Sequence, residues 1–297
     1  MLKDFEGVKM DEPLKKHSSY RIGGPAKYFF QLEETLDLPE LAKIADNEGV
    51  KIRVIGGGTN VLFPDEGLDE LVIRMNAHKI EIKDDILVAE AGAPLAVAII
   101  RAKDAGFNCL EPLMGLPGTI GGAVFGNAGA FGKWIGDFVE KVQVFDIAND
   151  FYNMRKEDLA FGYRTSAIKK MANVPIICKV FLKLKRDAGI LNDEVARASR
   201  TINQPTESSC GCFFKNPSGA SCTVSKNAVL SAGKLIDEAG LKGFTVGGAK
   251  VSEMHANFIV NMGNATQKDV LAVAGHVKKT IKEKNGIDLE EEVQVIK

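Results

Sequence analysis

The sequence predicts an α+β fold in two domains. The chain has 297 residues, which is enough for two domains that each bury a core. Up to about residue 186 the hydrophobic pattern indicates mainly short strands with a few helices. From Asp187 onward longer helical patterns alternate with short strands. We therefore expect one domain over 1–188 and a smaller α+β domain over 189–297.

Hydrophobic periodicity and turn residues define the elements of the first domain. Asp84 and Asp85 are expected at the turn of a hairpin. Pro94 suits the first residue of a helix, and Gly106 suits its end. The pattern predicts helices over 39–48 and 94–105, strands over 51–55, 71–73, 139–147 and 175–184, and a hairpin over 80–88.

In the second domain the clearest helix signal begins at Thr266. Thr266 and Asp269 form a capping-box pattern before a helix that we expect to extend to Lys284. Pro205 should stop an earlier helix, and Gly240 should end another. The pattern predicts helices over 190–204, 226–239 and 266–284, and strands over 256–261 and 293–296.

The composition argues against several classes of protein. A formal net charge of −1 gives no electrostatic reason to expect nucleic acid or an anionic membrane as a partner. The N-terminus lacks the apolar core of a signal peptide. The uncharged segment 112–132 is about as long as a membrane span, but its seven glycines and two prolines are a poor helix composition. We expect it to be a buried, glycine-rich loop.

The cysteines indicate free thiols in a reducing, cytoplasmic environment, because their number is odd and they are widely spread. Cys210, Cys212 and Cys222 lack the usual zinc spacing and have no nearby pair of histidines, so we expect no metal site. The five cysteines are Cys109, Cys178, Cys210, Cys212 and Cys222.

Two glycine-rich segments are candidates for a cofactor site. The first, Gly56-Gly57-Gly58-Thr59-Asn60, follows a predicted strand, and consecutive glycines allow backbone N–H groups to surround a pyrophosphate. A tight structural turn explains this segment equally well. The second, 115–132, would allow a flat ligand to lie against the backbone, and its alternative explanation is a packing corner.

An ordered set of motifs makes the interpretation specific. The set consists of 18–26 (SSYRIGGPA), 54–62 (VIGGGTNVL), 115–132, 161–166 (FGYRTS), 210–217 (CGCFFKNP), 232–236 (AGKLI), 255–258 (HANF) and 292–293 (EV). In this order, and over nearly the whole chain, it resembles the UDP-N-acetylenolpyruvoylglucosamine reductase (MurB) family. The interval from Phe161 to Asn173 has no room for a long insertion, so the chain resembles the shorter type that lacks an extra tyrosine-bearing loop.

The resemblance implies a fold and a reaction. An FAD-binding domain of the vanillyl-alcohol-oxidase (PCMH) type, with two subdomains split near residue 76, would precede a substrate-binding domain whose last strand carries a catalytic glutamate. NADPH would reduce noncovalently bound FAD, and the reduced flavin would give a hydride to C3 of UDP-N-acetylglucosamine enolpyruvate, forming UDP-N-acetylmuramate for peptidoglycan. The implied cofactor-binding residues are Arg21, Gly56, Gly57, Gly58, Thr59, Asn60, Leu62, Gly115, Pro117, Gly118, Thr119, Gly121, Gly122 and Ala123.

Three residues match the catalytic positions of the family. Arg164 would stabilise negative charge near the substrate carboxylate, and Glu292 matches the catalytic glutamate. Many relatives have serine where this chain has Cys212, which we expect to protonate C2. A thiol, with a reference pKa of about 8.5, is the stronger acid. A small buried core cysteine is the alternative reading of Cys212, and one that suits Cys210 better.

Substrate-binding positions match less closely. Tyr163, Lys215, Asn216 and Lys234 are the candidates, and a solvated lysine on a helix explains Lys234 equally well. His255 could serve as an acid or base or could be structural. A monomer is the favoured oligomeric state. Two alternative functions remain at this point: another FAD-dependent oxidase or dehydrogenase of the same fold, and a non-enzymatic nucleotide-binding module.

Overall fold

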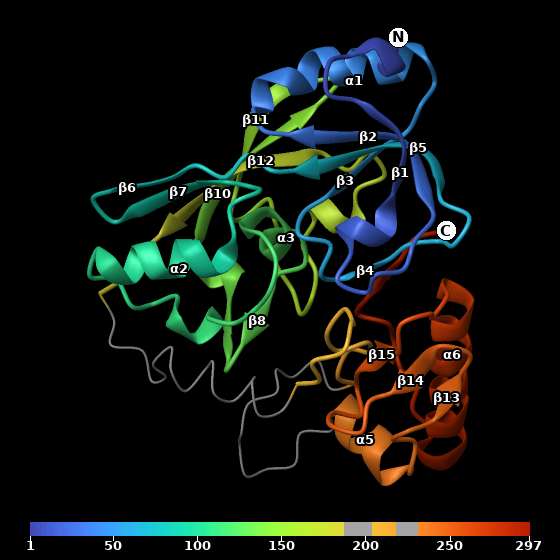
Figure 1. Ribbon diagram of the computed structural model, residues 1–297. Helices are drawn as coiled ribbons and strands as arrows, with labels where there is room; N and C mark the ends of the chain where they lie inside the picture. Colours follow the sequence, from blue (N-terminus) through green and yellow to red (C-terminus); the bar gives the residue numbers. More distant parts are fainter. Residues whose placement is uncertain (187–203, 218–230) are drawn as a thin grey trace. The chain divides into compact units, whose positions relative to one another are not determined.

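The computed structural model describes residues 1–186, 204–217 and 231–297 (Figure 1). The chain forms two compact units, each assembled from separate stretches of sequence. The first contains Met1–Glu12, Ala26–Gly57 and Asp69–Ala198, and the second contains Pro13–Pro25, Gly58–Leu68 and Ser199–Lys297. The boundary predicted between residues 188 and 189, and nearly all of the helix predicted over 190–204, lie outside the described residues and stay predictions.

The first unit begins with a four-stranded sheet in the order β1-β2-β5-β3 (Figure 1). Its strands are β1 (Lys9–Pro13), β2 (Pro25–Leu32), β5 (Leu68–Met75) and β3 (Ile52–Ile55), and β3 runs parallel to β5. Helix α1 (Leu38–Asn47) connects β2 to β3 and buries Leu38, Leu41, Ala42 and Ala45. This spacing is that of one helix face, so the predicted helix over 39–48 is confirmed.

A five-stranded antiparallel sheet forms the rest of this unit, in the order β11-β10-β12-β7-β6. Its strands are β11 (Asp150–Arg155), β10 (Val139–Asp146), β12 (Ile176–Lys183), β7 (Ile86–Glu90) and β6 (Ile80–Lys83). Lys83 pairs with Ile86, which confirms the predicted hairpin and leaves Asp84 and Asp85 at its turn. Helix α2 (Leu95–Asp104) contacts α3 (Ile120–Phe125), which packs on β7 and β12.

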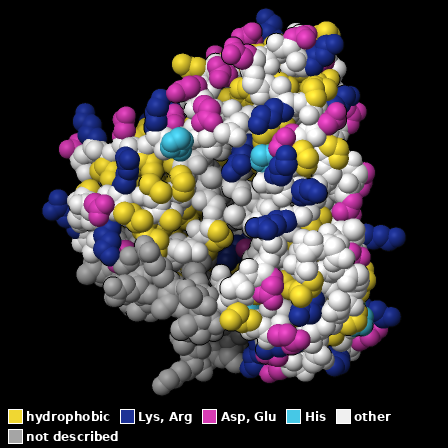
Figure 2. Space-filling view, viewed as in Figure 1, with side chains coloured by type: hydrophobic (Ala, Val, Ile, Leu, Met, Phe, Trp, Pro, Cys, Tyr) yellow, Lys and Arg dark blue, Asp and Glu magenta, His cyan; other side chains and the backbone are white. Residues whose placement is uncertain are grey.

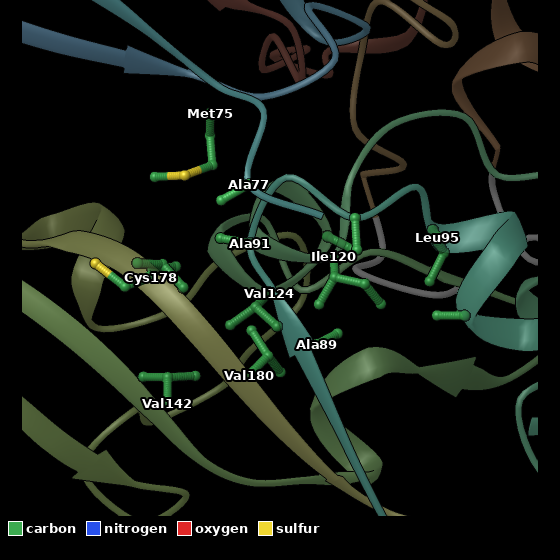
Figure 3. Packing of buried hydrophobic residues seen from close by; sticks show 14 of the residues in the cluster. Met75, Ala77, Ala89, Ala91, Leu95, Ile120, Val124, Val142, Cys178 and Val180 are labelled. Atoms are coloured by element: carbon green, nitrogen blue, oxygen red, sulfur yellow. The ribbon is translucent and has the colours of Figure 1, made fainter. Parts of the chain in front are cut away.

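In the core of this unit, small residues of the β7 region pack among branched residues of α3 and β12 (Figure 3). Ala89 and Ala91 from the β7 region lie among Ile120, Val124 and Val180, all nearly inaccessible to solvent. The alanines allow α3 to approach the sheet closely, because no larger side chain separates them. Helix α3 and the loop before it are thereby held against β7.

Segment 112–132 is more structured than predicted. In place of a loop it contains η4 (Glu111–Leu113), α3 and β8 (Gly129–Ala130), which pairs with β9 (Lys133–Trp134). Thr119 Oγ1 accepts a hydrogen bond from Gly122 N (3.3 Å) and caps α3, whose apolar side chains are buried. Capping and tertiary burial therefore outweigh the poor helix propensity of glycine. None of the described helices is long and apolar enough to cross a membrane.

A smaller correction concerns Pro94, which the sequence placed as the first residue of a helix. The structure has Pro94 at the N-cap, with extended backbone angles, and α2 begins at Leu95. Pro94 instead forms a bridge with Thr119, so the start of α2 lies beside the start of α3.

The second unit contains a three-stranded antiparallel sheet covered by a long helix (Figure 1). The strands are β13 (Thr245–Val246), β14 (Ala249–Val251) and β15 (Ile259–Asn261), and the helices are α6 (Gln267–Asn285) and α5 (Ala232–Glu238). A separate parallel pair joins β4 (Val61–Leu62) to β16 (Gln294–Val295).

Short 3-10 turns complete the described elements of both units: η1 (Leu2–Asp4), η2 (Leu14–His17), η3 (Thr35–Asp37), η5 (Ile135–Asp137) and η6 (Ile168–Lys170).

The helix predicted from Thr266 is confirmed together with its cap. Thr266 Oγ1 accepts from Asp269 N (3.1 Å), and Asp269 Oδ2 accepts from Thr266 N (3.0 Å). At the other end Gly286 adopts the left-handed conformation, with φ of +70°. The helix predicted over 226–239 begins later than predicted: Ser231 has extended backbone angles, and its Oγ accepts from Lys234 N (3.1 Å) as the N-cap of α5. Residues 226–230 lie outside the described residues.

Thr266→Ala should lower the stability of the protein by about 1 kcal/mol, because the Asp269 N–H at the start of α6 loses its capping acceptor, Thr266 Oγ1. The measurement is the thermal unfolding midpoint, which should fall by a few degrees. Thr280→Ala, in the interior of the same helix, is the matched control and should be neutral or slightly stabilising, because alanine is the better helix former. An equal effect of both substitutions would contradict the capping role.

Candidate active site

The two glycine-rich segments meet in the first unit. A Cβ atom placed on Gly56 would lie 2.5 Å from Thr119 Oγ1, so the end of β3 and the start of α3 are in direct contact. Among the described residues, the backbone N–H groups of Gly56 and Gly57 donate to no acceptor. Gly57, Gly115, Pro117 and Gly122 are exposed. An exposed glycine surface with available amide donors is suited to a phosphate-bearing ligand.

Part of the second segment has a structural explanation. A Cβ atom on Gly121 would lie 2.7 Å from Ala91 Cβ, so only glycine allows this approach of α3 to the sheet. Gly121 N also donates to the Ala91 carbonyl (2.9 Å), and Ala123 is buried. The cofactor roles predicted for these residues stay predictions, as do those for Gly118 and Thr119.

Three side-chain hydrogen bonds fasten segment 161–166 to the end of the second glycine-rich segment. In the first, Asn127 Nδ2 donates to the Gly162 carbonyl (2.9 Å). The Asn127 side chain is itself held by Gly136 N, which donates to its Oδ1 (3.1 Å). Ser166 Oγ donates to the Phe125 carbonyl (2.8 Å). Arg164 Nη1 donates to the Gly129 carbonyl (3.0 Å). The predicted catalytic arginine and the glycine-rich segment therefore form one local structure.

Arg164 has an unusual backbone conformation, with φ of +55°. A residue other than glycine in this left-handed region costs on the order of 1–3 kcal/mol, and such strain is concentrated at functional sites. The guanidinium carbon also lies 5.7 Å from the centre of the Tyr163 ring, within cation–π range. The side chain of Arg164 is half-buried. Its direction is therefore fixed by both backbone and side-chain contacts.

The second unit brings Cys212 and Glu292 onto neighbouring segments. Phe214 forms an antiparallel bridge with Glu291, and Glu292 N donates to the Phe213 carbonyl (2.8 Å). Gly211, immediately before Cys212, has φ of +77°, a conformation that favours glycine. Cys212 thus lies between a left-handed turn and the residue that binds Glu292, and its side chain is partly exposed.

The first glycine-rich segment continues into this unit. Asn60 Nδ2 donates to the Glu292 carbonyl (3.2 Å), and Gln294 N donates to the Asn60 carbonyl (3.0 Å). Gly58 has φ of +65° and leaves no room for a Cβ atom, which would collide with the His17 carbonyl. Of the predicted cofactor residues, Arg21, Gly58, Thr59, Asn60 and Leu62 belong to the second unit. The segment predicted to bind cofactor is therefore bonded to the backbone of the predicted catalytic glutamate. Contrary to the prediction, Glu292 is not in the last strand, because β16 begins only at Gln294.

The two glutamates before Glu292 are engaged by lysines. Lys215 Nζ lies 3.0 Å from a carboxylate oxygen of Glu290, and Lys278 Nζ lies 2.8 Å from one of Glu291. Burial acts to raise the pKa of Glu291, but Lys278 outweighs it, so that this pKa lies below its usual value. The pair of Lys215 with the exposed Glu290 is weak, because solvent screens it, and an anionic ligand could replace it.

The other predicted substrate residues have distinct surroundings. Asn216 is buried, and its Oδ1 accepts from Ala232 N (3.0 Å) at the start of α5. Lys234 is exposed on α5 and lies 3.7 Å from Glu238 in an i,i+4 pair. These contacts explain both residues structurally, and their substrate roles stay predictions.

His255 has a structural environment. Burial lowers its pKa, so the ring is neutral near pH 7, and Nδ1 accepts from Asn257 N (3.2 Å). Cys210 is also buried, and its thiol donates to the Val61 carbonyl (3.1 Å). Burial raises the pKa of Cys210 to about 11. None of the described cysteines forms a disulfide: these are Cys109, Cys178, Cys210 and Cys212, and Cys222 lies outside the described residues.

Three residues that support the segments of the predicted site were not predicted from the sequence: Asn127, Ser166 and Asn257. Each is buried and hydrogen-bonded to the backbone of a segment that carries a predicted site residue. The sequence did mark Asn127 as unusual, because it is the only polar side chain in the otherwise apolar stretch 120–132. On the face shown in Figure 2, basic and acidic side chains both occur over much of the surface, so charge alone does not mark the site.

Comparison with known proteins covers nearly the entire chain. The model of an FAD binding domain matches residues 26–150, and that of the UDP-N-acetylenolpyruvoylglucosamine reductase C-terminal domain matches 204–296. The reductase of Clostridioides difficile is 36% identical over 98% of this chain and 94% of its own. That of Limosilactobacillus reuteri is 37% identical over 97% of this chain and 95% of its own. The crystal structure of the Thermus caldophilus reductase is 36% identical, covers 98% of both chains and has a TM-score of 0.77.

These matches confirm the predicted fold class, an FAD-binding domain of the PCMH type followed by a smaller C-terminal domain. They leave the predicted shorter subtype untested.

The different surroundings of Cys210 and Cys212 predict different reactivity in the native protein. With a pKa of about 11, Cys210 is a thiolate in only about one molecule in a thousand at pH 8. Iodoacetamide at pH 8 should therefore alkylate the partly exposed Cys212 at least ~10-fold faster than Cys210. Tandem mass spectrometry of the peptide that carries both residues separates the two sites. Equal alkylation rates would contradict the buried position of Cys210, and denatured protein is the control in which the rates converge.

Proposed function

The chain belongs to the UDP-N-acetylenolpyruvoylglucosamine reductase (MurB) family, and on that premise we propose that it reduces UDP-N-acetylglucosamine enolpyruvate to UDP-N-acetylmuramate with FAD and NADPH. It is an FAD-binding oxidoreductase of peptidoglycan precursor synthesis, a UDP-N-acetylmuramate dehydrogenase. The observation that carries the proposed mechanism is the hydrogen bond between Glu292 N and the Phe213 carbonyl, which joins the segments of both predicted reacting residues.

The glycine-rich surface of the first unit fits a flavin dinucleotide. The available amides of Gly56 and Gly57 suit its pyrophosphate, and the exposed backbone at Gly115 and Gly122 suits a flat ring. When bound, FAD would carry a hydride equivalent from NADPH to C3 of the enolpyruvyl group. The protein's part is to bind and orient the reactants and to manage charge and protons.

Cys212 is proposed as the proton donor to C2 of the substrate. Hydride addition at C3 leaves negative charge at C2 and its carboxylate, so a proton must arrive at C2. A partly exposed thiol can lose its proton to that carbon and regain one from solvent. The left-handed turn at Gly211 and the pairing of Phe213 fix the backbone on both sides of Cys212.

Arg164 and Glu292 are proposed to manage the charge of the same step. The planar guanidinium of Arg164 presents a fork of donors that suits a carboxylate or an enolate, and Gly129 and Tyr163 restrict its direction. Glu292 would act beside Cys212, because its own amide is bonded to the residue that follows Cys212. Tyr163, Lys215, Asn216 and Lys234 are proposed to bind the substrate, with the lysines complementing its diphosphate.

The alternatives considered from the sequence have little support. Family membership excludes a non-enzymatic nucleotide-binding module. An oxidase of the same fold is disfavoured by the match of residues 204–296 to the reductase C-terminal domain. A single experiment tests the proposal against the oxidase: anaerobic NADPH should bleach the flavin of the purified protein, and the enolpyruvyl substrate should restore its colour without oxygen. Reoxidation that requires oxygen and ignores the substrate would refute it.

Variants of Cys212 separate the two half-reactions. Cys212→Ala should leave bleaching by NADPH nearly intact and slow reoxidation by the substrate at least ~100-fold, because only the second half-reaction needs a proton at C2. Cys212→Ser should recover much of this loss. Cys210→Ala is the matched control and should be close to neutral, since its thiol binds only within the core. Anaerobic stopped-flow absorbance measures both rates, and fast reoxidation in Cys212→Ala would remove it as the donor.

Gly56→Ala tests the position of the cofactor. The new Cβ atom would displace Thr119, an overpacking effect that costs about 1–3 kcal/mol, and would distort the surface proposed to bind the flavin, so less flavin should be retained than in wild type. The flavin retained after gel filtration measures the effect. Gly275→Ala, on α6 with nothing within 4 Å of its new Cβ, is the control and should keep its flavin. Full flavin content in folded Gly56→Ala would mean that the cofactor lies elsewhere.

A further inference from the structure

We propose that Asn257 is the positioning residue of the reaction centre, holding the backbone that carries Cys212 in fixed register with the segment that carries Glu292. The inference rests on the proposed function, because it takes Cys212 and Glu292 as the reacting pair. Asn257 lies in the second unit, shortly before β15, and is 3% exposed.

Asn257 binds the segment after Cys212 through three hydrogen bonds. Its side-chain Oδ1 accepts from Phe214 N (3.0 Å), and its Nδ2 donates to the Phe214 carbonyl (2.8 Å). Its backbone carbonyl accepts from Phe213 N (2.7 Å). The amide side chain thus pairs with Phe214 as a neighbouring strand would, and both backbone groups of that residue are satisfied.

The segment after Cys212 is also bonded to the backbone around Glu292. The Phe213 carbonyl accepts from Glu292 N (2.8 Å), so Phe213 is bonded to Asn257 through its N–H and to Glu292 through its C=O. Lys215 N continues the pairing by donating to the Glu290 carbonyl (2.8 Å). A displacement of Phe213 would therefore move Cys212 and the Glu292 pairing together.

The surroundings of Asn257 make its side chain a support and not a reacting group. Its Oδ1 and Nδ2 atoms are engaged by Phe214, and its own N–H donates to His255 Nδ1 (3.2 Å). The Phe213 and Phe214 rings, each 1% exposed, pack beside each other with centroids 5.0 Å apart. Within this buried setting an unpaired amide or carbonyl is costly, so removal of the Asn257 side chain should shift the Phe214 backbone.

The test uses flavin-loaded, full-length protein and follows the two half-reactions by anaerobic stopped-flow. Asn257→Ala should slow substrate-driven reoxidation by about 10- to 100-fold, the effect of misplacing a reacting group. Reduction by NADPH should stay within about two-fold of wild type, because it needs no proton at C2. Val273→Ala, which shortens a fully buried side chain on α6, is the matched control for lost stability and should leave both rates unchanged.

A second readout does not depend on turnover. The alkylation rate of Cys212 by iodoacetamide, measured from pH 6 to pH 10, should change by at least ~3-fold in Asn257→Ala, because the surroundings of the thiol change. Val273→Ala should match wild type in this profile. If Asn257→Ala does not fold, Asn257→Asp replaces it, since an ionised carboxylate keeps the shape and the acceptor for Phe214 N–H but cannot donate to the Phe214 carbonyl.

The outcomes separate this inference from the proposed function. Slow reoxidation and an altered Cys212 profile in the Asn257 variants, but not in Val273→Ala, would support the positioning role. Reoxidation at the wild-type rate in a folded Asn257 variant, while Cys212→Ala is slow, would overturn it and leave the function intact. Fast reoxidation in Cys212→Ala would instead refute the reacting pair itself. Equal slowing in the Asn257 variants and Val273→Ala would reduce Asn257 to a general stabilising residue.

Discussion

A backbone hydrogen bond from Glu292 N to the Phe213 carbonyl joins two segments that lie far apart in the sequence. The rest of the second unit supports this contact. Asn257 holds the Phe213–Phe214 backbone from one side, and Asn60 holds the Glu292 carbonyl from the other. Buried hydrogen bonds to backbone groups specify one arrangement, because any slip leaves a donor or acceptor unsatisfied. A thiol and a carboxylate on flexible loops would have no such common register.

In the first unit, too, two segments are held in one arrangement, here by side chains that bond to a glycine-rich backbone. Asn127, Arg164 and Ser166 all contribute to the pairing of segments 125–129 and 161–166. Glycine at position 129 is required there, because a Cβ atom would collide with Trp134. The glycines therefore serve both close packing and the exposed surface at positions 57, 115 and 122. This dual use explains why a phosphate cradle and a packing corner could not be distinguished from the sequence.

Local signals predicted local structure well. The hairpin at Asp84-Asp85 and the Thr266 capping box depend on residues close in the sequence, and both are confirmed. Helix α3 was missed because it is stabilised by burial against Ala89 and Ala91. The helix propensities of its residues take no account of such tertiary contacts. The family and its fold were predictable because the motifs occur in order along the chain. The roles of Asn127 and Asn257 were not, since each side chain binds a partner more than 30 residues away.

The composition of the second unit has a consequence for how the protein is made. Strand β4, at Val61–Leu62, pairs with β16, at Gln294–Val295, and no earlier part of the described chain takes that place. During synthesis β4 leaves the ribosome long before β16, because the two strands lie far apart in the sequence. Until β16 is made, the edge of β4 stays unpaired, and such an edge is open to chaperones and proteases. The pairing also joins residues distant in the sequence, and contacts of this kind slow folding. Deletion of β16 would thus leave β4 without the strand that pairs with it.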